Sequence, residues 1–528
     1  MRQPHRSAVQ RSVSALLVCS ALSSSASGQA LLDPLWTKRI APPLWEALHV
    51  IPDPDGGTYF VRRHIGALGG LDILLQRRSA AGELLGESDF GSAADDFLAD
   101  AAEFPSGGFV LSGDSAGDLG GTGAGGTFVA RFDGQGQVIW VDQFPGSARS
   151  VAVAPDLRVV ALYHDGAGLR LRWYTATGSL LVEATVQVPY AIASTQPGSR
   201  SEDLVAGSSG QAFVGWYINS ASLFGTVISL HDAQGALLVE HIRNTNSWIG
   251  PRLAPDGAGG AFAAIHDASG GPGYRVFVHH YGPSGALTWG TTIDSSGFND
   301  SGVVTYDRRG GCVVALATTG SIASPSSGDQ DTYVAHYSPQ GVLQAHAQNP
   351  RIEYQYAQAV AVDAAGGIVV IESDVGASKT LTRFAPQRIG AVTCSPAAPN
   401  STGLGAELLA VGDIAAAADN VLLWARGLPW GSTGYFLGSM TLGSSHPPGS
   451  QGELCLGGAI GRFSAPGQIG TAGQDGTIGL ALDLTAVPTP VGPVTALAGQ
   501  TWSFQAWYRD ANPGPTNNFT DAVSITFQ

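Results

Sequence analysis

The sequence has 528 residues, a formal net charge of -15, 72 glycines and only 13% charged residues. Soluble chains average about 25% charged residues and about 7% Gly, so this composition favours many tight turns over amphipathic helices. The negative charge opposes binding to the polyanionic backbone of DNA or RNA, and we expect no nucleic-acid partner. The chain is also too long for one ordinary core, which predicts two domains, one of them repetitive.

The first thirty residues have the pattern of a secretory signal peptide. Positive charges at Arg2 and Arg6 precede an apolar stretch at 13–22, which is too short to cross a bilayer, and small residues fill 23–30. We therefore expect an exported mature chain that begins near Leu31. No later stretch approaches the roughly 20 apolar residues of a transmembrane helix, so we expect no transmembrane segment.

An internal repeat dominates the next 360 residues. A turn followed by a short β-type run recurs seven times, with its second turn position at residues 57, 108, 158, 211, 260, 311 and 367. A second hairpin turn lies between successive copies and ends at Gly82, Gly136, Gly178, Gly235, Gly285 and Gly341. Two hairpins in a unit of about fifty residues predict four short antiparallel strands, which is the pattern of a propeller blade. The fold class expected for residues 31–390 is therefore an all-β, seven-bladed β-propeller.

The seventh unit ends before its fourth strand. Residues 34–40 have a sequence similar to the outer strand at 287–293, since both contain an aromatic Trp and end in Ile. We expect this N-terminal segment to complete the last blade, because ring closure removes exposed strand edges. The segment 93–104, which has some helical character by itself, should be a loop and an inner strand in register with the other units.

Two of these units resemble the bacterial β-propeller repeats called SBBP repeats. The similarity is carried by Asp331-Thr332-Tyr333-Val334-Ala335-His336-Tyr337-Ser338-Pro339-Gln340-Gly341 and by Ala359-Val360-Ala361-Val362-Asp363-Ala364-Ala365-Gly366-Gly367. The resemblance covers roughly residues 31–390 and is weaker around 150–215. It implies a secreted or surface propeller and says almost nothing about the ligand.

The repeat ends before Cys394, and residues 391–528 show a different pattern. Strand-like runs separated by Gly, Pro and Ser occur at 407–411, 421–426, 434–440, 453–463, 478–484, 501–509 and 522–527. They predict an antiparallel, jelly-roll-like β-sandwich. Cys394 and Cys455 both lie in this segment and should form a disulfide in an exported protein, whereas Cys312 lies in an apolar run and is expected to be buried.

This C-terminal segment resembles an uncharacterised domain of secreted planctomycete-type bacterial proteins. The similar stretches are Cys394-Ser395-Pro396, Asn400-Ser401-Thr402-Gly403, Cys455-Leu456-Gly457-Gly458 and the strand from Gly499 to Asp510. Because that domain follows varied N-terminal domains, the resemblance implies attachment, sorting or spacing rather than chemistry.

Four residues are candidates for ligand binding. His280 and His336 each lie five residues before a hairpin glycine, so they should occupy the same place in neighbouring blades. A metal needs three or more ligands, so a packing role competes with zinc binding there. Trp430 and Trp507 could stack on a glycan, although aromatic side chains more often fill cores.

The sequence contains neither a strained Ser nucleophile turn nor closely spaced His and acidic metal ligands, so no residue is assigned a catalytic role and no cofactor is expected. Aspartates at 53–55, 95–96 and 329–331 could bind calcium, but none has the spacing of a calcium loop, and we expect solvated turn residues there instead. We expect a non-enzymatic binding or scaffold protein, secreted or at the cell envelope, whose partner is an unidentified protein or glycan. The alternative is a propeller enzyme acting on polysaccharide. Three or more His or acidic side chains converging in the channel would favour the enzyme, and apolar and small residues would favour the binder.

Overall fold

The computed structural model describes residues 30–528. The exceptions are residues 41–47, 54–56, 80–81, 106, 120–124, 188–201, 220–223, 248, 270–272, 296, 328, 350–354, 364–365, 375–378, 386–387, 413, 420 and 473–475. The expected signal peptide, apart from its last residue, lies outside the described residues. Apart from two short 3-10 turns at Ser208–Gly210 and Ala416–Ala418, the regular structure of the described residues is entirely β, as expected.

The repeat region forms seven sheets in the part of the chain that the structure describes, each with four antiparallel strands, and one of them has a short parallel fifth strand. Their first strands are β3 (Leu48–Pro52), β7 (Asp96–Glu103), β11 (Ser147–Val153), β15 (Glu202–Ala206), β19 (Arg252–Pro255), β23 (Asn299–Tyr306) and β27 (Gln355–Val362). The second strands are β4 (Thr58–Ile65), β8 (Phe109–Ser115), β12 (Val159–His164), β16 (Ala212–Asn219), β20 (Ala261–Asp267), β24 (Cys312–Thr318) and β28 (Ile368–Asp374). The third strands are β5 (Leu71–Arg78), β9 (Gly126–Phe132), β13 (Leu169–Tyr174), β17 (Phe224–His231), β21 (Arg275–Tyr281), β25 (Asp331–Tyr337) and β29 (Lys379–Ala385). The fourth strands are β6 (Leu84–Phe90), β10 (Val138–Phe144), β14 (Leu180–Thr185), β18 (Leu237–Asn244), β22 (Leu287–Ile293), β26 (Leu343–Asn349) and β2 (Asp33–Ile40).

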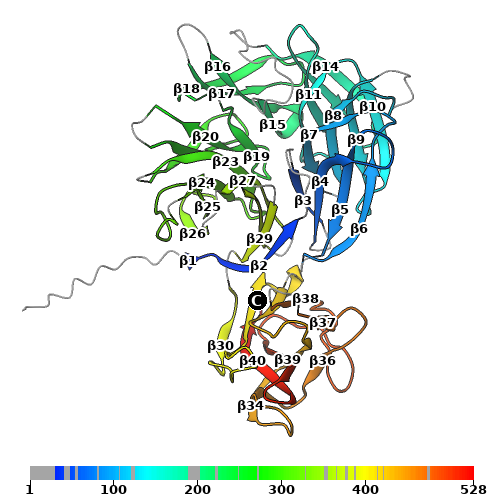
Figure 1. The fold of residues 1–528 in the computed structure, drawn as a ribbon. Coiled ribbons are helices and arrows are strands. Elements are labelled where there is room, and N and C mark those ends of the chain that lie inside the picture. The colour runs from blue at the N-terminus through cyan, green and yellow to red at the C-terminus, as the bar shows by residue number, and fades with distance from the viewer. Residues whose placement is uncertain are drawn as a thin grey trace, which may run out of the picture.

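These sheets are arranged as a β-propeller, with the first strand of each sheet innermost (Figure 1). Each inner strand contacts the inner strand of the next sheet, and β27 of the last sheet contacts β3 of the first, so the ring is continuous. Below, the sheets are called blades 1 to 7 in the order of their inner strands. Apolar side chains of neighbouring blades share their cores, as in the cluster of Val160, Leu162, Leu204 and Val214 between blades 3 and 4.

The N-terminal strand β2 closes the ring, as expected from its similarity to residues 287–293. It pairs antiparallel with β29 from Asp33 opposite Ala385 to Ile40 opposite Lys379. Just before it, the two-residue strand β1 (Ala30–Leu31) pairs in parallel with β26 of blade 6, and Leu32 is buried in the core between blades 6 and 7. The start of the described chain therefore joins two blades.

The C-terminal segment forms two main sheets. One contains β30 (Ala391–Thr393), β40 (Pro515–Thr526), β39 (Thr501–Ala511), β33 (Thr433–Ser439) and β36 (Gly461–Phe463), with β37 (Gly470–Thr471) also paired to β33. The other contains β31 (Glu407–Gly412), β32 (Val421–Arg426) and β38 (Ile478–Leu482), and β34 (Thr441–Ser445) pairs separately with β35 (Leu454–Gly457). The single run expected at 453–463 is therefore wrong, because Gly458 has a positive φ and separates β35 from β36.

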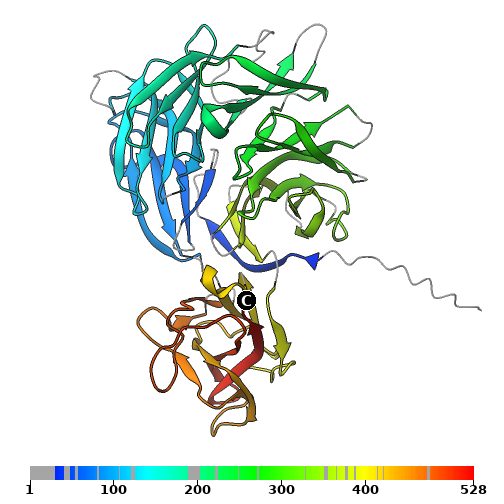
Figure 2. The same cartoon turned by 180° about the vertical axis from the view of Figure 1, so that it is seen from behind.

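Strands β31 and β32 of the three-stranded sheet are buried on both faces. Leu408 and Leu423 contribute to the core shared with the larger sheet, whereas Leu409 and Trp424 contact Phe60 and other apolar residues of blades 1 and 7. Alternate residues of these strands thus face two different cores. The C-terminal segment is consequently seated on the propeller at the blades where the ring closes (Figures 1 and 2).

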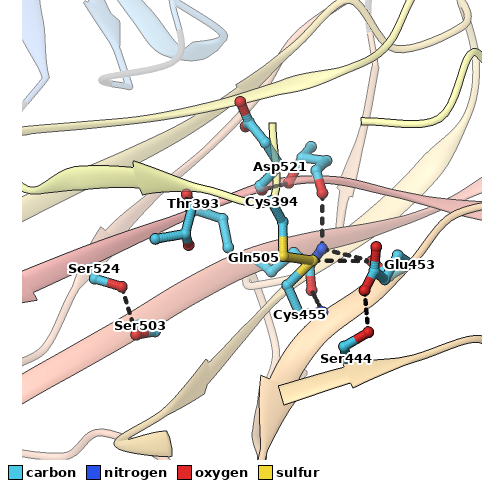
Figure 3. The surroundings of a disulfide bond; sticks show 11 residues. Thr393, Cys394, Ser444, Glu453, Cys455, Ser503, Gln505, Asp521 and Ser524 are labelled. Carbon is cyan, nitrogen blue, oxygen red and sulfur yellow. Dashed lines mark hydrogen bonds between the residues drawn. A yellow bond between two sulfur atoms is a disulfide. The ribbon is translucent and has the colours of Figure 1, made fainter. Parts of the chain in front are cut away.

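The expected disulfide is confirmed. Cys394 and Cys455 are bonded, with their Cα atoms 6.3 Å apart, and the bond joins the residue after β30 to β35 (Figure 3). Beside it, the Gln505 side chain accepts a hydrogen bond from the Cys455 N–H at 2.9 Å and donates one to the Glu453 carbonyl at 2.9 Å. Cys312 is buried in β24 as a free thiol, and burial raises the pKa of this thiol.

Candidate functional site

One position of the repeat supplies a ring of channel-lining side chains. Eight residues before the second turn position, and opposite equivalent residues of the second strands, the seven inner strands carry His49, Asp100, Ser150, Asp203, Arg252, Val303 and Ala359. The ring therefore has polar side chains on blades 1 to 5 and apolar ones on blades 6 and 7. We call the five polar residues the polar arc.

The polar arc borders a cavity of about 680 Å³ that is lined by all seven inner strands. Small-molecule sites usually occupy about 300–1,000 Å³, so the cavity has the size of a ligand site. Its lining also includes Glu103, Glu202, Arg149 and Arg308. Acidic and His side chains therefore do converge in the channel, and by number alone they meet the condition that favours an enzyme.

Hydrogen bonds link the polar arc from blade to blade. Ser150 Oγ lies 2.5 Å from Asp100 Oδ2 and 3.3 Å from Asp203 Oδ1, so the two carboxylates share one hydroxyl. His49 Nδ1 is 3.4 Å from Asp100 Oδ1. One chain of polar contacts thus runs across the inner strands of blades 1 to 4.

Main-chain N–H groups of the neighbouring blades also bind these carboxylates. The Val151 N–H donates to Asp100 Oδ2 at 3.0 Å, and the Leu253 N–H donates to Asp203 Oδ2 at 2.8 Å. Each aspartate therefore joins its own inner strand to that of the next blade. Such interactions offset the cost of placing a carboxylate in a partly buried site.

The acidity of Asp203 is altered by this environment. Burial, together with the nearby Asp100 carboxylate, raises the pKa of Asp203 to about 6, while Arg252 and the Leu253 N–H act in the opposite direction. Two carboxyl groups in one polar network thus have unequal environments, which is how paired acids acquire different protonation states near neutral pH.

Two ion pairs lie beside the polar arc. Arg149 Nε is 3.5 Å from Glu202 Oε2, which joins blades 3 and 4. Arg308, which follows β23 of blade 6, places its Nη2 2.6 Å from Glu103 of blade 2 and donates through Nε to the Val362 carbonyl at 2.9 Å. Because blades 2 and 6 are not neighbours in the ring, the Arg308–Glu103 pair crosses one end of the channel.

His280 and His336 occupy equivalent places, each next to the last residue of a third strand, β21 or β25, where it faces an aspartate of a turn. His280 Nε2 lies 3.0 Å from Asp256 Oδ2, and His336 Nε2 lies 2.8 Å from Asp307 Oδ2. Burial raises the pKa of these carboxyl groups, but the hydrogen bonds from His and from main-chain N–H groups outweigh it and lower the pKa. Neither His lines the channel cavity.

The same place in other blades shows why the position is structural. Arg77 pairs with Asp53 at 2.5 Å, and Arg383 pairs with the buried Asp363 at 2.5 Å. In each of these four blades, the paired aspartate lies four residues before the second turn position. Where blade 2 carries Phe104 instead, the Arg131 guanidinium lies 3.7 Å from the ring centroid. The side chain at this position of the third strand thus contacts a residue of the turn that joins the first two strands of the same blade.

The two candidate tryptophans lie in the C-terminal segment and in different environments. Trp430 is 76% exposed, in the loop before β33. Trp507, in β39, is partly buried, and its ring centroid is 4.9 Å from that of Tyr435 on the neighbouring strand β33. The structure brings neither Trp430 nor Trp507 together with the channel residues.

Among the described residues, one group of three acidic, His or Cys side chains lies close enough to share a metal, namely Cys394, Glu453 and Cys455. Both cysteines are in the disulfide, so this group is not a metal site. Of the proposed calcium-binding aspartates, Asp53 is paired with Arg77, and Asp55 lies outside the described residues.

The polar arc itself was not identified from the sequence, although a signal for it exists. Residues 49, 100, 150, 203 and 252 stand at one constant distance before the second turn position, as the residues of the His280 position do before the second hairpin. The repeat pattern does not tell which position of the inner strand faces the channel. β-Bulges in β7 and β11 shift the pleat just before Asp100 and Ser150, so simple alternation does not locate that face.

The raised pKa of Asp203 predicts a pH-dependent stability. The folded-state pKa of about 6 exceeds the unfolded value of 3.8, so this group contributes stability that is present below the unfolded pKa and lost as pH rises through 6. On going from pH 7 to pH 4, wild-type protein should therefore gain about 2 kcal/mol of stability relative to Asp203→Asn. Urea unfolding of both proteins at the two pH values measures this difference, and a difference that does not change with pH would contradict it.

Comparison with known proteins assigns no family. Neither a protein-family model nor a curated protein matches the chain. The solved structure of BamB from Moraxella catarrhalis is 11% identical, with a TM-score of 0.34 over 67% of this chain and 100% of that chain. The Pan2 WD40 domain of Neurospora crassa is 7% identical, with a TM-score of 0.37 over 67% and 97%. Plexin A of Drosophila, in complex with Semaphorin 1b, is 9% identical, with a TM-score of 0.39 over 67% and 88%.

Within the residues that the structure describes, no helix has the length and apolar character needed to cross a bilayer.

Proposed function

We propose that this chain is an exported or cell-envelope binding protein, without catalytic activity, that recognises its ligand in the propeller channel. Its architecture is a seven-bladed propeller at residues 31–390 followed by a β-sandwich at 391–528. The observation that carries the proposal is the polar arc, which faces a ligand-sized cavity beside the apolar residues Val303 and Ala359.

Export is supported by two features of different kinds. The N-terminal pattern of residues 1–30 is that of a signal peptide. The disulfide between Cys394 and Cys455 is of a type that persists in oxidising compartments and is rare in the cytosol. Together they favour a location outside the cytoplasm.

The ligand class follows from the chemistry of the polar arc. Asp100 and Asp203 accept hydrogen bonds, Arg252 donates them, and Ser150 and His49 can do both. Opposite charges are mixed, so the arc suits a ligand with many hydroxyl groups better than a strongly charged one. Val303 and Ala359 supply an apolar wall of the kind on which a sugar ring can rest. We therefore propose the end of an envelope glycan as the ligand.

A binding role fits the carboxylates better than catalysis does. Asp100 and Asp203 are held in place by Ser150 and by N–H groups of the next blades, so they present fixed acceptors to the cavity, as a recognition site does. A second candidate, a polysaccharide hydrolase or lyase, is favoured by one observation, the raised pKa of Asp203 beside Asp100. Retaining glycosidases use carboxyl pairs about 5–5.5 Å apart in which one group is protonated.

The test uses residues 31–528, applied to immobilised cell-envelope and polysaccharide fractions of the host. We expect wild-type protein to be retained and Asp203→Asn to bind at least about tenfold more weakly, because one acceptor of the arc is replaced. Asp294→Asn is the matched control, since Asp294 is exposed and lies after the outer strand β22. Equal retention of all three proteins would contradict the channel site. Release of sugar fragments by wild-type protein but not by Asp203→Asn would favour the enzyme.

A further inference from the structure

Two buried carboxylates meet at the junction of blades 1 and 2, away from the channel cavity. Asp72 is the second residue of β5, and Asp96 is the first residue of β7. Both side chains are 0% exposed. An ionised carboxylate in such a place is costly unless donors or a cation compensate its charge.

Hydrogen-bond donors pair with some, but not all, of the oxygens of the Asp72 and Asp96 carboxylates. Asp96 Oδ2 accepts a hydrogen bond from the Ser92 N–H at 2.6 Å, and Asp72 Oδ2 accepts one from the Leu68 N–H at 3.0 Å. Asp72 Oδ1, in contrast, is buried and has no hydrogen-bond partner in the described part of the chain. One carboxylate oxygen is thus left without compensation beside a second carboxylate.

Gly91 shows that the two oxygens face the same small space. A Cβ atom on Gly91 would lie 2.6 Å from Asp72 Oδ1 and 2.6 Å from Asp96 Oδ2. Both oxygens therefore border the bare Cα of Gly91, and they lie at most about 5.2 Å from each other. One Ca²⁺ ion holds oxygen ligands at about 2.3–2.6 Å, so two of its ligands can be up to about 5.2 Å apart, and the separation of these two oxygens is compatible with one shared Ca²⁺.

The equivalent junctions of the ring do not have this arrangement. At the junction of blades 6 and 7 the two places are held by Asp331 and Gln355, and at the junction of blades 5 and 6 by Arg275 and Asn299. Asp331 is buried like Asp72, but Ser327 Oγ donates to its Oδ1 at 2.5 Å and Gln348 Nε2 donates to its Oδ2 at 2.8 Å. Among the junctions described at both places, two carboxylates meet only between blades 1 and 2.

We propose that Asp72 and Asp96 are the carboxylate ligands of a calcium site that joins blades 1 and 2. Main-chain carbonyl groups or water would complete the coordination, as Ca²⁺ commonly accepts. Two carboxylates neutralise one divalent cation, and sites with few charged ligands in extracellular modules bind calcium with Kd values of about 10⁻⁴–10⁻³ M. Asp95, the other candidate calcium ligand of the 95–96 pair in the sequence, instead accepts a hydrogen bond from the Leu71 N–H at 3.0 Å.

The site is tested by isothermal titration of CaCl₂ into chelator-treated residues 31–528. We expect one site in the wild-type protein, at least tenfold weaker binding in Asp72→Asn, and unchanged binding in the matched control Asp331→Asn. Calcium should also raise the Tm of the wild-type protein and of Asp331→Asn, but not that of Asp72→Asn, because a ligand bound only by the folded state stabilises it.

A second variant covers the case in which Asp72→Asn does not fold. Gly91→Ala keeps both carboxylates but places a methyl group in the shared space, and it should lose the calcium response. If calcium does not bind the wild-type protein, or binds Gly91→Ala or Asp72→Asn as tightly as it binds the wild-type protein, the proposal is wrong. In that case a proton shared by the two carboxyl groups is the explanation, and Asp72→Asn would be the more stable protein at neutral pH.

Discussion

Deletion of residues 31–42 is expected to remove several kcal/mol of stability and to abolish the cooperative unfolding of the propeller. Without β2, strand β29 loses its partner from Ala385 to Lys379 and becomes an exposed edge. The core between blades 6 and 7 also loses Leu32, which is 3% exposed. Folded proteins are stable by only about 5–15 kcal/mol, so a loss of this size is a large part of the total.

The measurement is thermal unfolding followed by circular dichroism or calorimetry. As a control, residues 31–42 are replaced by a Gly/Ser segment of equal length, which keeps the chain length but cannot supply the apolar side chains of the strand. It should behave like the deletion. A deleted protein with the same Tm as the wild type would show that β2 does not hold the ring closed.

Replacement of Trp424 by Ala is expected to destabilise the protein by about 3–5 kcal/mol, the usual cost of emptying the site of a large buried aromatic residue. Trp424 is 1% exposed and belongs to the cluster that joins the C-terminal sheet to Phe60, Val369 and Leu381 of the propeller. The Arg383 guanidinium also lies 5.8 Å from its ring centroid. The substitution should therefore weaken the contact between the two parts of the chain.

Trp430→Ala is the matched control, because the same side chain is removed from a site that is 76% exposed. Its free energy of unfolding should change by no more than about 0.5 kcal/mol. Denaturant unfolding followed by circular dichroism compares the two variants without relying on tryptophan fluorescence. Equal effects of the two substitutions would contradict the proposed seating of the C-terminal sheet on the propeller.

Much of the fold could be predicted because the seven copies of the repeat can be aligned with one another within the one sequence. The constant spacing of turns placed the strands of each unit, and the similarity of residues 34–40 to 287–293 identified the closing strand. It also placed His280 and His336 in equivalent positions. It could not show that an aspartate of the preceding turn reaches each of them, since that depends on the twist between neighbouring strands.

The contact between the two parts of the chain was not predicted, although the sequence contains a sign of it. Residues 408–411 and 421–425 are continuous apolar runs rather than alternating ones. Such runs are typical of strands that are buried on both faces. By themselves they predict sandwich strands, whereas the structure also places the sheet that contains them against blades 1 and 7.

The Asp72–Asp96 pair and the channel site could not be predicted from the sequence, for a different reason. Asp72 begins a third strand and Asp96 an inner strand, so no single repeat position contains both. Likewise, Asp100, Ser150 and Asp203 come together only through bulges and the ring geometry. Sites built between blades require the packing of neighbouring units, which periodicity alone does not describe.

The most direct test of the central claim, that the ligand is recognised in the channel, is hydrogen–deuterium exchange of residues 31–528 with and without the envelope fraction that retains the chain. The account predicts slower exchange in the inner strands β7, β11, β15 and β19, which carry four of the five residues of the polar arc. Protection confined to residues 391–528, with the inner strands unchanged, would contradict it and would place recognition on the C-terminal sheets.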